Sequence, residues 1–392
     1  MKKKSSNLLL IGLIMIGLVL RVPFTSIPPV LTNIAQGLHI PVGELGTLTT
    51  IPLLMFAICS PFASKIASRF GYAATFVGVL IVLALGSLVR IFNVPFLFIG
   101  TALIGMAIAF LNVLMPAAVM NYFPNRIGII TSIYTTVMTC ATALMSALAV
   151  PITQGSSWKT LLIIITGLVL LTWGIWLVNL KGDQHISNET AEQTDAIKDS
   201  VWKNKDAWIM LLFSGLQSLL FYTGLTWLPT MASDAGLSQT AAGNLSGIYS
   251  LIGIPFSIIL PAFIEKLALK SRRWVILGFD SLGIIGVAML LHQQSSFGYW
   301  LVVTLLIGCS TGALFPYLMT SFSLKASTAQ RSAELSGMSQ AGGYLIAAIG
   351  PFIFGYGHTL FHSWTLVTWC LLILTVLMTI MNWLMEKKEI IY

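Results

Sequence analysis

The sequence has 392 residues, of which 56% are hydrophobic and only 9% charged, and its formal net charge is +8. This composition excludes a soluble globular domain and is typical of an integral membrane protein. The basic excess does not call for a nucleic-acid partner, because its distribution along the chain follows a membrane topology, as described below. The four cysteines lie far apart inside apolar segments, which favours buried thiols over a disulfide framework or a metal centre.

The first apolar segment, residues 8–30, contains a single arginine, Arg21. At ~1.5 Å per residue, Arg21 lies about 20 Å into a hydrocarbon core roughly 30 Å thick. An ionised side chain at that depth costs at least ~2.5–3.5 kcal/mol, so it must face a polar interior. Pro23, Pro28 and Pro29 follow, and each removes a backbone donor and weakens the helix. We expect Arg21 to hold a ligand; the alternative is a structural anchor paired with backbone carbonyls.

Twelve apolar segments of membrane-spanning length follow one another along the chain. Their approximate bounds are 8–30, 44–63, 73–91, 96–120, 127–150, 160–180, 207–231, 241–264, 274–291, 297–321, 335–357 and 364–385. The polar stretch 181–206 mixes both charge signs, so we expect a solvated cytoplasmic linker there. The expected fold is an all-α integral membrane protein with twelve transmembrane helices, arranged as six-helix halves at 1–180 and 207–392.

Lysine and arginine are distributed unevenly between the two sides that this topology implies. With the N-terminus inside, eighteen of the 21 basic residues fall on the inner side, two (Arg90 and Lys159) on the outer side, and Arg21 within the membrane. This bias predicts that both termini are cytoplasmic. We therefore expect a multi-pass protein of the cell (plasma) membrane, and a monomer.

The two halves repeat each other at an offset of 200 residues. The matching pairs are Pro29 and Pro229, Ala35 and Ala235, Gly43 and Gly243, Leu45 and Leu245, and Pro61 and Pro261. A duplicated six-helix unit with a central linker is typical of an alternating-access transporter. The halves are therefore expected to be pseudo-symmetric.

Signatures of enzymes are missing from the sequence: it has no paired carboxylates, phosphate loop or nucleophile elbow. We expect no enzyme activity, no cofactor and no metal site. His358 and His362 are four residues apart, but they lack a third ligand and are interpreted as surface residues. Asp280 is the one carboxylate well inside a predicted span. It is either a structural partner near the inner boundary, which we favour, or a proton-coupling group.

Uncharged polar residues within the spans supply the remaining candidates for a binding site. Arg21 and Thr25 are four residues apart and lie on one helical face. Small and hydroxyl residues on the other spans are ordinary in close helix packing, whereas larger polar groups are better candidates for lining a cavity. The predicted substrate-binding residues are Arg21, Thr25, Asn112, Tyr134, Gln217, Gln340 and Tyr344.

Several stretches of the chain resemble the major facilitator superfamily, and more narrowly its branch of cyanate and 2-nitroimidazole transporters. The most specific are LRVPFTSIPPVL at 20–31, the stretch from GELGTLTTIP to SRFG at 43–71, and SGMSQAGGYLIAAIGPFIFG at 336–355. Weaker matches at 100–119 and 126–138 extend the likeness over essentially the whole chain. The resemblance implies a secondary transporter with a central site between two halves that rock against each other.

The sequence also departs from the pattern of that superfamily. Ser64 and Ser68 stand where the loop between spans two and three has its first glycine and its aspartate. The arginine of span four in proton-coupled members is missing, and span five lacks the glycine–proline motif of antiporters. These departures make drug–proton antiport less favoured than transport of a small anionic or polar solute.

The sequence therefore predicts a transporter of a cyanate-, nitrate- or nitroimidazole-like solute, with Arg21 in the central site. The guanidinium group offers a planar fork of donors to an anion or a nitro group, a geometry that lysine lacks. One alternative is an efflux transporter for small toxic or drug-like compounds; another, of a different class, is a transporter-like solute sensor. The expected partners are a small-molecule substrate and the lipid bilayer, and no nucleic acid.

Overall fold

The computed structural model describes residues 2–27, 30–39, 47–191 and 200–392, and the described chain forms helices and no strand. Pro28, Pro29, Gly43 and Leu45, which the sequence singles out, lie outside the described residues. The helices are α1 (Lys2–Val19), α2 (Val22–Thr25), α3 (Leu31–Leu38), α4 (Thr47–Phe70), α5 (Tyr72–Val89), α6 (Val94–Tyr122), η3 (Pro124–Arg126), α7 (Ile127–Gly155), α8 (Trp158–Ala191), η5 (Val201–Lys203), α9 (Lys205–Asp234), α10 (Gln239–Leu251), α11 (Gly253–Lys266), α12 (Leu269–Met289), η6 (Leu290–His292), α13 (Phe297–Leu324), α14 (Ala329–Phe361) and α15 (Thr365–Met385).

Eleven helical stretches of the described chain are long and apolar enough to cross a membrane, and α14, with 33 residues, is a further long helix. The all-helical architecture predicted from the sequence is confirmed. The helix of the sixth span continues beyond the predicted boundary at residue 180, because α8 ends at Ala191 and so takes in the first part of the predicted linker.

Prolines account for two breaks in these spans. Pro23 has no N–H, and its ring would clash with the carbonyl of Val19 four residues earlier, so α1 ends at Val19 and α2 restarts at Val22. By the same reasoning Pro255 clashes with the carbonyl of Leu251, where α10 ends. The first span predicted at 8–30 is therefore a broken helix, with Arg21 in the break.

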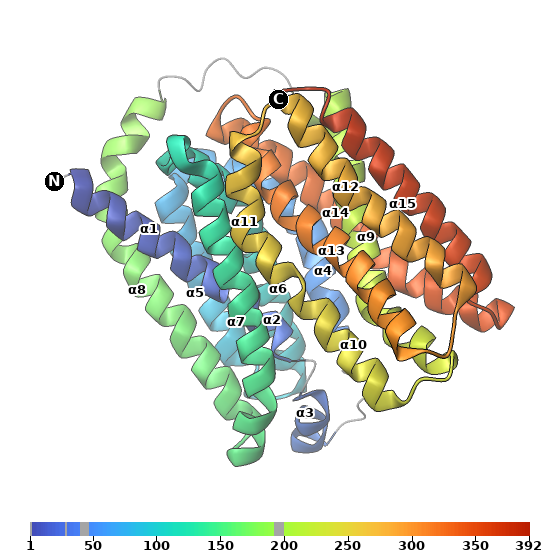
Figure 1. Ribbon diagram of the computed structural model, residues 1–392. Helices are drawn as coiled ribbons and strands as arrows, with labels where there is room; N and C mark the ends of the chain where they lie inside the picture. The colour runs from blue at the N-terminus through green and yellow to red at the C-terminus, as the bar shows by residue number, and fades with distance from the viewer. Residues whose placement is uncertain (1, 28–29, 40–46, 192–199) are drawn as a thin grey trace.

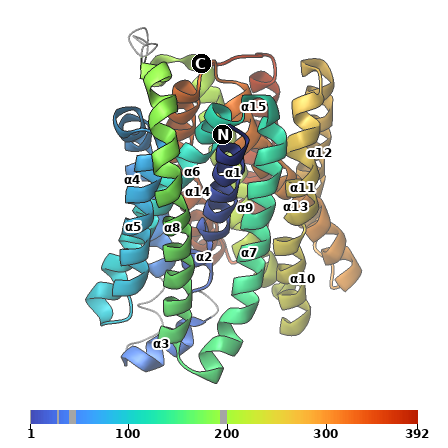
Figure 2. The same ribbon diagram turned by 90° about the vertical axis from the view of Figure 1, so that its left-hand side faces the viewer.

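Two groups of helices each enclose a hydrophobic core. One core is built from buried residues between Val201 and Tyr392; a second draws on buried residues from Leu9 to Trp176, with Ala333 and Tyr344 added from α14. Figure 1 shows α5, α7 and α8 on one side of the bundle and α9, α12 and α15 on the other. Both termini lie at the same end, and α3 lies at the opposite end (Figures 1 and 2). The division at residues 180 and 207 remains a prediction that this arrangement supports.

The two groups touch along α4–α14 and α7–α11, and Figure 2 shows α7 beside α10 and α11. Near the end that carries the termini, the N–H of Gly128 in α7 donates to Oε2 of Glu265 in α11 at 2.9 Å. The hydroxyl of Ser323 in α13 donates to the carbonyl of Pro116 in α6, also at 2.9 Å. These contacts join the α1–α8 group to the α9–α15 group at that end.

Candidate substrate site at the break in the first span

Arg21 lies between α1 and α2, where Pro23 prevents a continuous helix, and its side chain is half-buried. Its guanidinium lies over the ring of Phe315 in α13, with Cζ 4.6 Å from the ring centroid. No hydrogen bond or ion pair of the guanidinium is found among the described residues. A cation over an aromatic face gains ~0.5–2 kcal/mol, which offsets only part of the cost of burying an unpaired charge. Its donors are therefore free to bind a ligand.

The surroundings of Arg21 are aromatic and come mainly from the opposite group of helices. Tyr222 in α9 and Tyr344 in α14 both lie within electrostatic reach of Arg21. The ring of Tyr344 packs against that of Phe56 in α4, with centroids 4.9 Å apart. Within the described part of the chain, neither tyrosine hydroxyl has a hydrogen-bond partner. The site thus combines one cation and two hydroxyls that are free to form hydrogen bonds with several aromatic rings. Such a set of groups can bind a planar polar molecule.

Thr25 lies on the Arg21 side of the break, but its hydroxyl is used locally. Oγ1 of Thr25 donates to the carbonyl of Arg21 at 3.0 Å, and the carbonyl of Thr25 accepts from Ser146 in α7 at 3.3 Å. The Arg21 carbonyl also accepts from the N–H groups of Phe24 and Thr25, so the Thr25 hydroxyl adds a further donor at the break. In this conformation Thr25 stabilises the break that carries Arg21.

Arg90, which the sequence places in an outer loop, is buried at the break. It is only 2% exposed, and its Nη1 donates to the carbonyl of Pro23 at 2.8 Å. Burial lowers the pKa of Arg90 to about 10, so the group stays charged at neutral pH. Arg90 therefore fixes the backbone two residues after Arg21. The sequence carries no signal for this contact, because 67 residues separate Arg90 from Pro23.

Asn112 and Tyr134 are both buried in the first group of helices. No hydrogen bond of the Asn112 amide in α6 is found among the described residues. The Tyr134 hydroxyl in α7 is buried without a partner, and the backbone of this residue packs closely against Gly17 in α1. The structure shows no contact between these two side chains and Arg21. Their role in binding stays a prediction. It is favoured by the Asn112 amide and the Tyr134 hydroxyl, which have no hydrogen-bond partner among the described residues.

Gln217 and Gln340 are occupied by contacts within the second group. Nε2 of Gln217 donates to the carbonyl of Thr311 at 3.3 Å, and its Oε1 accepts from Ser218 at 3.4 Å. Nε2 of Gln340 donates to the Ser336 hydroxyl at 2.8 Å, while its Oε1 is buried without a partner. The Gln217 amide joins α9 to α13, whereas the Gln340 amide bonds within α14, and the binding role of both stays a prediction.

Asp280 lies far from this site in the architecture. It is 1% exposed in α12, and its Oδ2 accepts from Nδ2 of Asn382 in α15 at 2.7 Å. Figure 1 shows α12 and α15 at the edge of the bundle, on the side opposite α1. This position supports the structural interpretation of Asp280 over a role in coupling at the central site.

Phe315, Tyr222 and Phe56 are site residues that sequence reasoning missed. Each is an aromatic residue within an apolar span, and nothing in local spacing distinguishes it from an ordinary packing residue. The pairing joins α9 and α13 to the α1–α2 break, from which they are roughly 200 and 300 residues away in the sequence. The arrangement can bind an anion or nitro group on the guanidinium while the rings stack on a planar ligand.

Comparison with known proteins agrees with this architecture. The model of the Major Facilitator Superfamily matches residues 9–351. The chain is 36% identical over 371 residues to the uncharacterized transporter YycB of Bacillus subtilis (strain 168), covering 93% of this chain and 90% of the relative. It is 33% identical over 379 residues to a 2-nitroimidazole transporter of Escherichia coli (strain K12), covering 96% and 95%. The solved structure of the proton:xylose symporter XylE superposes with a TM-score of 0.78 at 12% identity, covering 98% and 96%.

Proposed function

The chain belongs to the Major Facilitator Superfamily, and we propose that it moves a small anionic or polar solute across the membrane by alternating access, with Arg21 in the central site. It is a multi-pass membrane transporter and not an enzyme. The observation that carries the proposal is the Arg21 guanidinium, unpaired within the described chain and set against Phe315 of the opposite helix group.

The chemistry of the site favours a flat solute that bears a delocalised negative charge or a nitro group. The guanidinium fork matches two oxygens in one plane, and the neighbouring rings offer stacking surfaces at the same depth. The relative named as a 2-nitroimidazole transporter supports this class, because a nitroimidazole combines a planar ring with a nitro group. Nitrate and cyanate satisfy the charge requirement without the ring.

Substrate binding by purified Arg21→Gln tests the role of Arg21. Loss of one charge-assisted hydrogen bond costs ~1.5–3 kcal/mol, so affinity for 2-nitroimidazole or nitrate should fall about 10–100-fold. Arg69→Gln is a matched control, because Arg69 is an exposed arginine that lies over the ring of Phe70 at 5.4 Å. Unchanged affinity of Arg21→Gln with a lowered melting temperature would show that Arg21 is a structural anchor.

Uptake by proteoliposomes separates transport from sensing and import from export. Accumulation of labelled solute that requires an imposed proton or solute gradient supports a secondary transporter. Accumulation by inside-out vesicles, and not by right-side-out vesicles, supports the alternative of an efflux transporter. Binding without any flux supports a solute sensor and contradicts the proposal.

A further inference from the structure

Basic side chains outnumber acidic ones at the end of α12 and α15 that lies beside the termini. Glu386 is 1% exposed, and its carboxylate accepts from Nε of Arg272 at 2.9 Å and pairs with Nζ of Lys325 at 3.1 Å. Arg273, which follows Arg272 in the sequence, forms no ion pair with any of the described residues. Its Nη2 donates to the carbonyl of Glu386 at 2.9 Å, and its Nε is buried without a partner. This positive charge lacks a counter-anion from the described chain.

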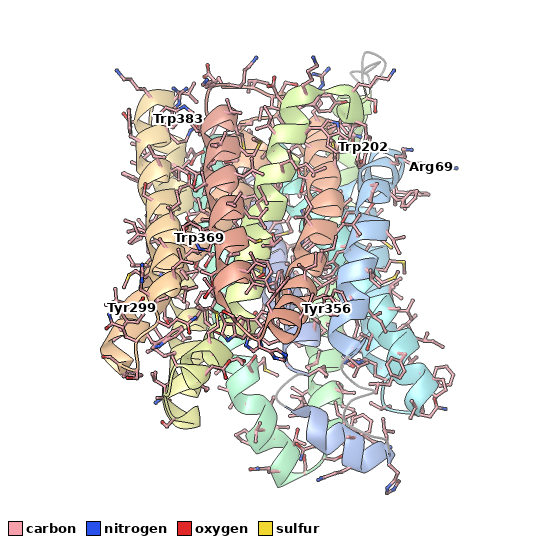
Figure 3. All side chains as sticks on the ribbon, turned by 90° about the vertical axis from the view of Figure 1, so that its right-hand side faces the viewer. Arg69, Trp202, Tyr299, Tyr356, Trp369 and Trp383 are labelled. Carbon is pink, nitrogen blue, oxygen red and sulfur yellow. The ribbon has the colours of Figure 1, made fainter. Side chains whose placement is uncertain are left out.

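Arg273 also lines a shallow groove between two helices, which is too tight to admit a water molecule, so a ligand can bind only along its rim. Ile276, Leu277 and Asp280 of α12 and Asn382, Trp383 and Glu386 of α15 form its other walls. The Arg273 guanidinium lies over the ring of Trp383 at 5.0 Å, and Trp274 meets that ring edge-on at 5.3 Å. Trp274 is 59% exposed, and Figure 3 places Trp383 at the same end of the molecule as Trp202 and Arg69.

The groove lies at the level of the lipid headgroups along the membrane normal. Arg273 and Trp274 lie in the first turns of the span Leu269–His292, and Trp383 lies in the last turn of Thr365–Met385. Tryptophan is enriched at this level of membrane proteins, because its ring is apolar and its N–H is polar. The positive-inside bias assigns this end to the cytoplasmic leaflet, where anionic lipids attract basic residues near the surface.

We propose that the rim of this groove binds an anionic phospholipid, with the phosphate on Arg273 and the acyl chains along the outer face of α15. Lys270 is exposed and lies three residues before Arg273 on the same helical face, so it contributes a second positive charge. Below the phosphate, exposed Ile380, Val376 and Ile373 form a continuous apolar strip for a chain. Asp280 and Glu386 also line the groove, and their negative charge disfavours an anionic phosphate inside it, which leaves the rim beside Arg273 and Lys270.

The bilayer-facing position favours a lipid over a water-soluble phosphate. A soluble phosphate has no group to place against the exposed apolar strip, whereas the acyl chain of a phospholipid already lies at that depth in the bilayer. The ligand class is therefore an anionic glycerophospholipid such as phosphatidylglycerol. Zwitterionic phosphatidylcholine should bind less tightly, because its choline group brings a positive charge to the same basic face.

Native mass spectrometry of the delipidated full chain, titrated with dioleoyl phosphatidylglycerol, tests the proposal. Arg273→Gln should weaken binding of the first lipid about tenfold. Lys270→Gln, at an exposed position that does not endanger folding, should weaken it about two- to threefold. Arg69→Gln, an exposed arginine at the same end but outside the groove, should leave binding unchanged.

Two ligand controls decide the source of the phosphate. Phosphatidylcholine should bind more weakly than phosphatidylglycerol to the unaltered chain and should not respond to Arg273→Gln. Glycerol 3-phosphate should not displace the lipid; displacement would assign the site to a soluble phosphate and overturn the proposal. The proposal would also be overturned if Lys270→Gln and a folded Arg273→Gln both bound phosphatidylglycerol as tightly as the unaltered chain does.

Discussion

Replacing Glu265 by alanine tests whether the contact between α7 and α11 keeps the termini end of the bundle closed. Oε2 of Glu265 accepts from the N–H of Gly128 at 2.9 Å, in the first turn of α7. A hydrogen bond to a charged group contributes ~1.5–3 kcal/mol, and a carboxylate at a helix N-terminus a further ~0.3–1 kcal/mol. Glu265 is half-exposed, and its carboxylate regains water when this end opens. We therefore estimate that the contact stabilises the closed state by about 2 kcal/mol. The open population at this end should then rise about 30-fold, since ~1.4 kcal/mol is tenfold.

Labelling of a cysteine at Ser323 measures that opening. Ser323 is 1% exposed at the contact between α13 and α6, and the four native cysteines are first replaced by serine. In inside-out vesicles, Glu265→Ala should raise the rate of maleimide labelling at least tenfold, whereas Lys266→Ala should not. Gly128→Ala should act like Glu265→Ala, because a Cβ there would lie 2.4 Å from the carbonyl of Pro261. An unchanged rate in a folded Glu265→Ala protein would refute the reasoning.

Three further predictions follow from the buried charges and the topology. Glu386→Gln leaves two buried cations unpaired and should destabilise the protein by about 3–5 kcal/mol. The deficit, read from unfolding in detergent, should shrink as the pH rises toward about 8: burial lowers the pKa of Lys325 to about 8 although Glu386 raises it, so without Glu386 this cation loses its proton below that pH. Asp280→Asn should keep substantial transport; loss of proton-driven accumulation with intact counterflow would identify Asp280 as the coupling group. A cysteine at Ser233 should react with an impermeant maleimide on intact cells and one at Ser187 should not; the reverse labelling would invert the topology.

The broken first span shows how far local chemistry reaches. Pro23 clashes with the carbonyl of Val19 in any continuous helix, so a weakened helix beside Arg21 follows from the order of residues alone. The depth of Arg21 follows from counting along an apolar segment. The family also follows from short stretches of sequence, and the match over residues 9–351 confirms it.

The polar candidates show where sequence reasoning loses resolution. Gln217 and Tyr344 look equivalent on paper, since both are large polar residues within apolar spans. In the structure the Gln217 amide bonds to Thr311 and Ser218 within its own helix group, whereas Tyr344 lies near Arg21. The rotation of each helix about its axis decides between these positions, and that rotation depends on packing against neighbours.

Composition, apolar periodicity and the positions of proline and arginine determine a membrane-spanning helical transporter with a charge held at a helix break. These are local properties, because the free-energy cost of placing a polar group in the hydrocarbon core does not depend on which helices surround it. Only the tertiary structure decides that Phe315 covers Arg21, that Arg90 holds the carbonyl of Pro23, and that Arg273 forms no ion pair within the described part of the chain. Each of these contacts joins segments far apart in sequence, so it depends on the register between packed helices, which no local pattern encodes.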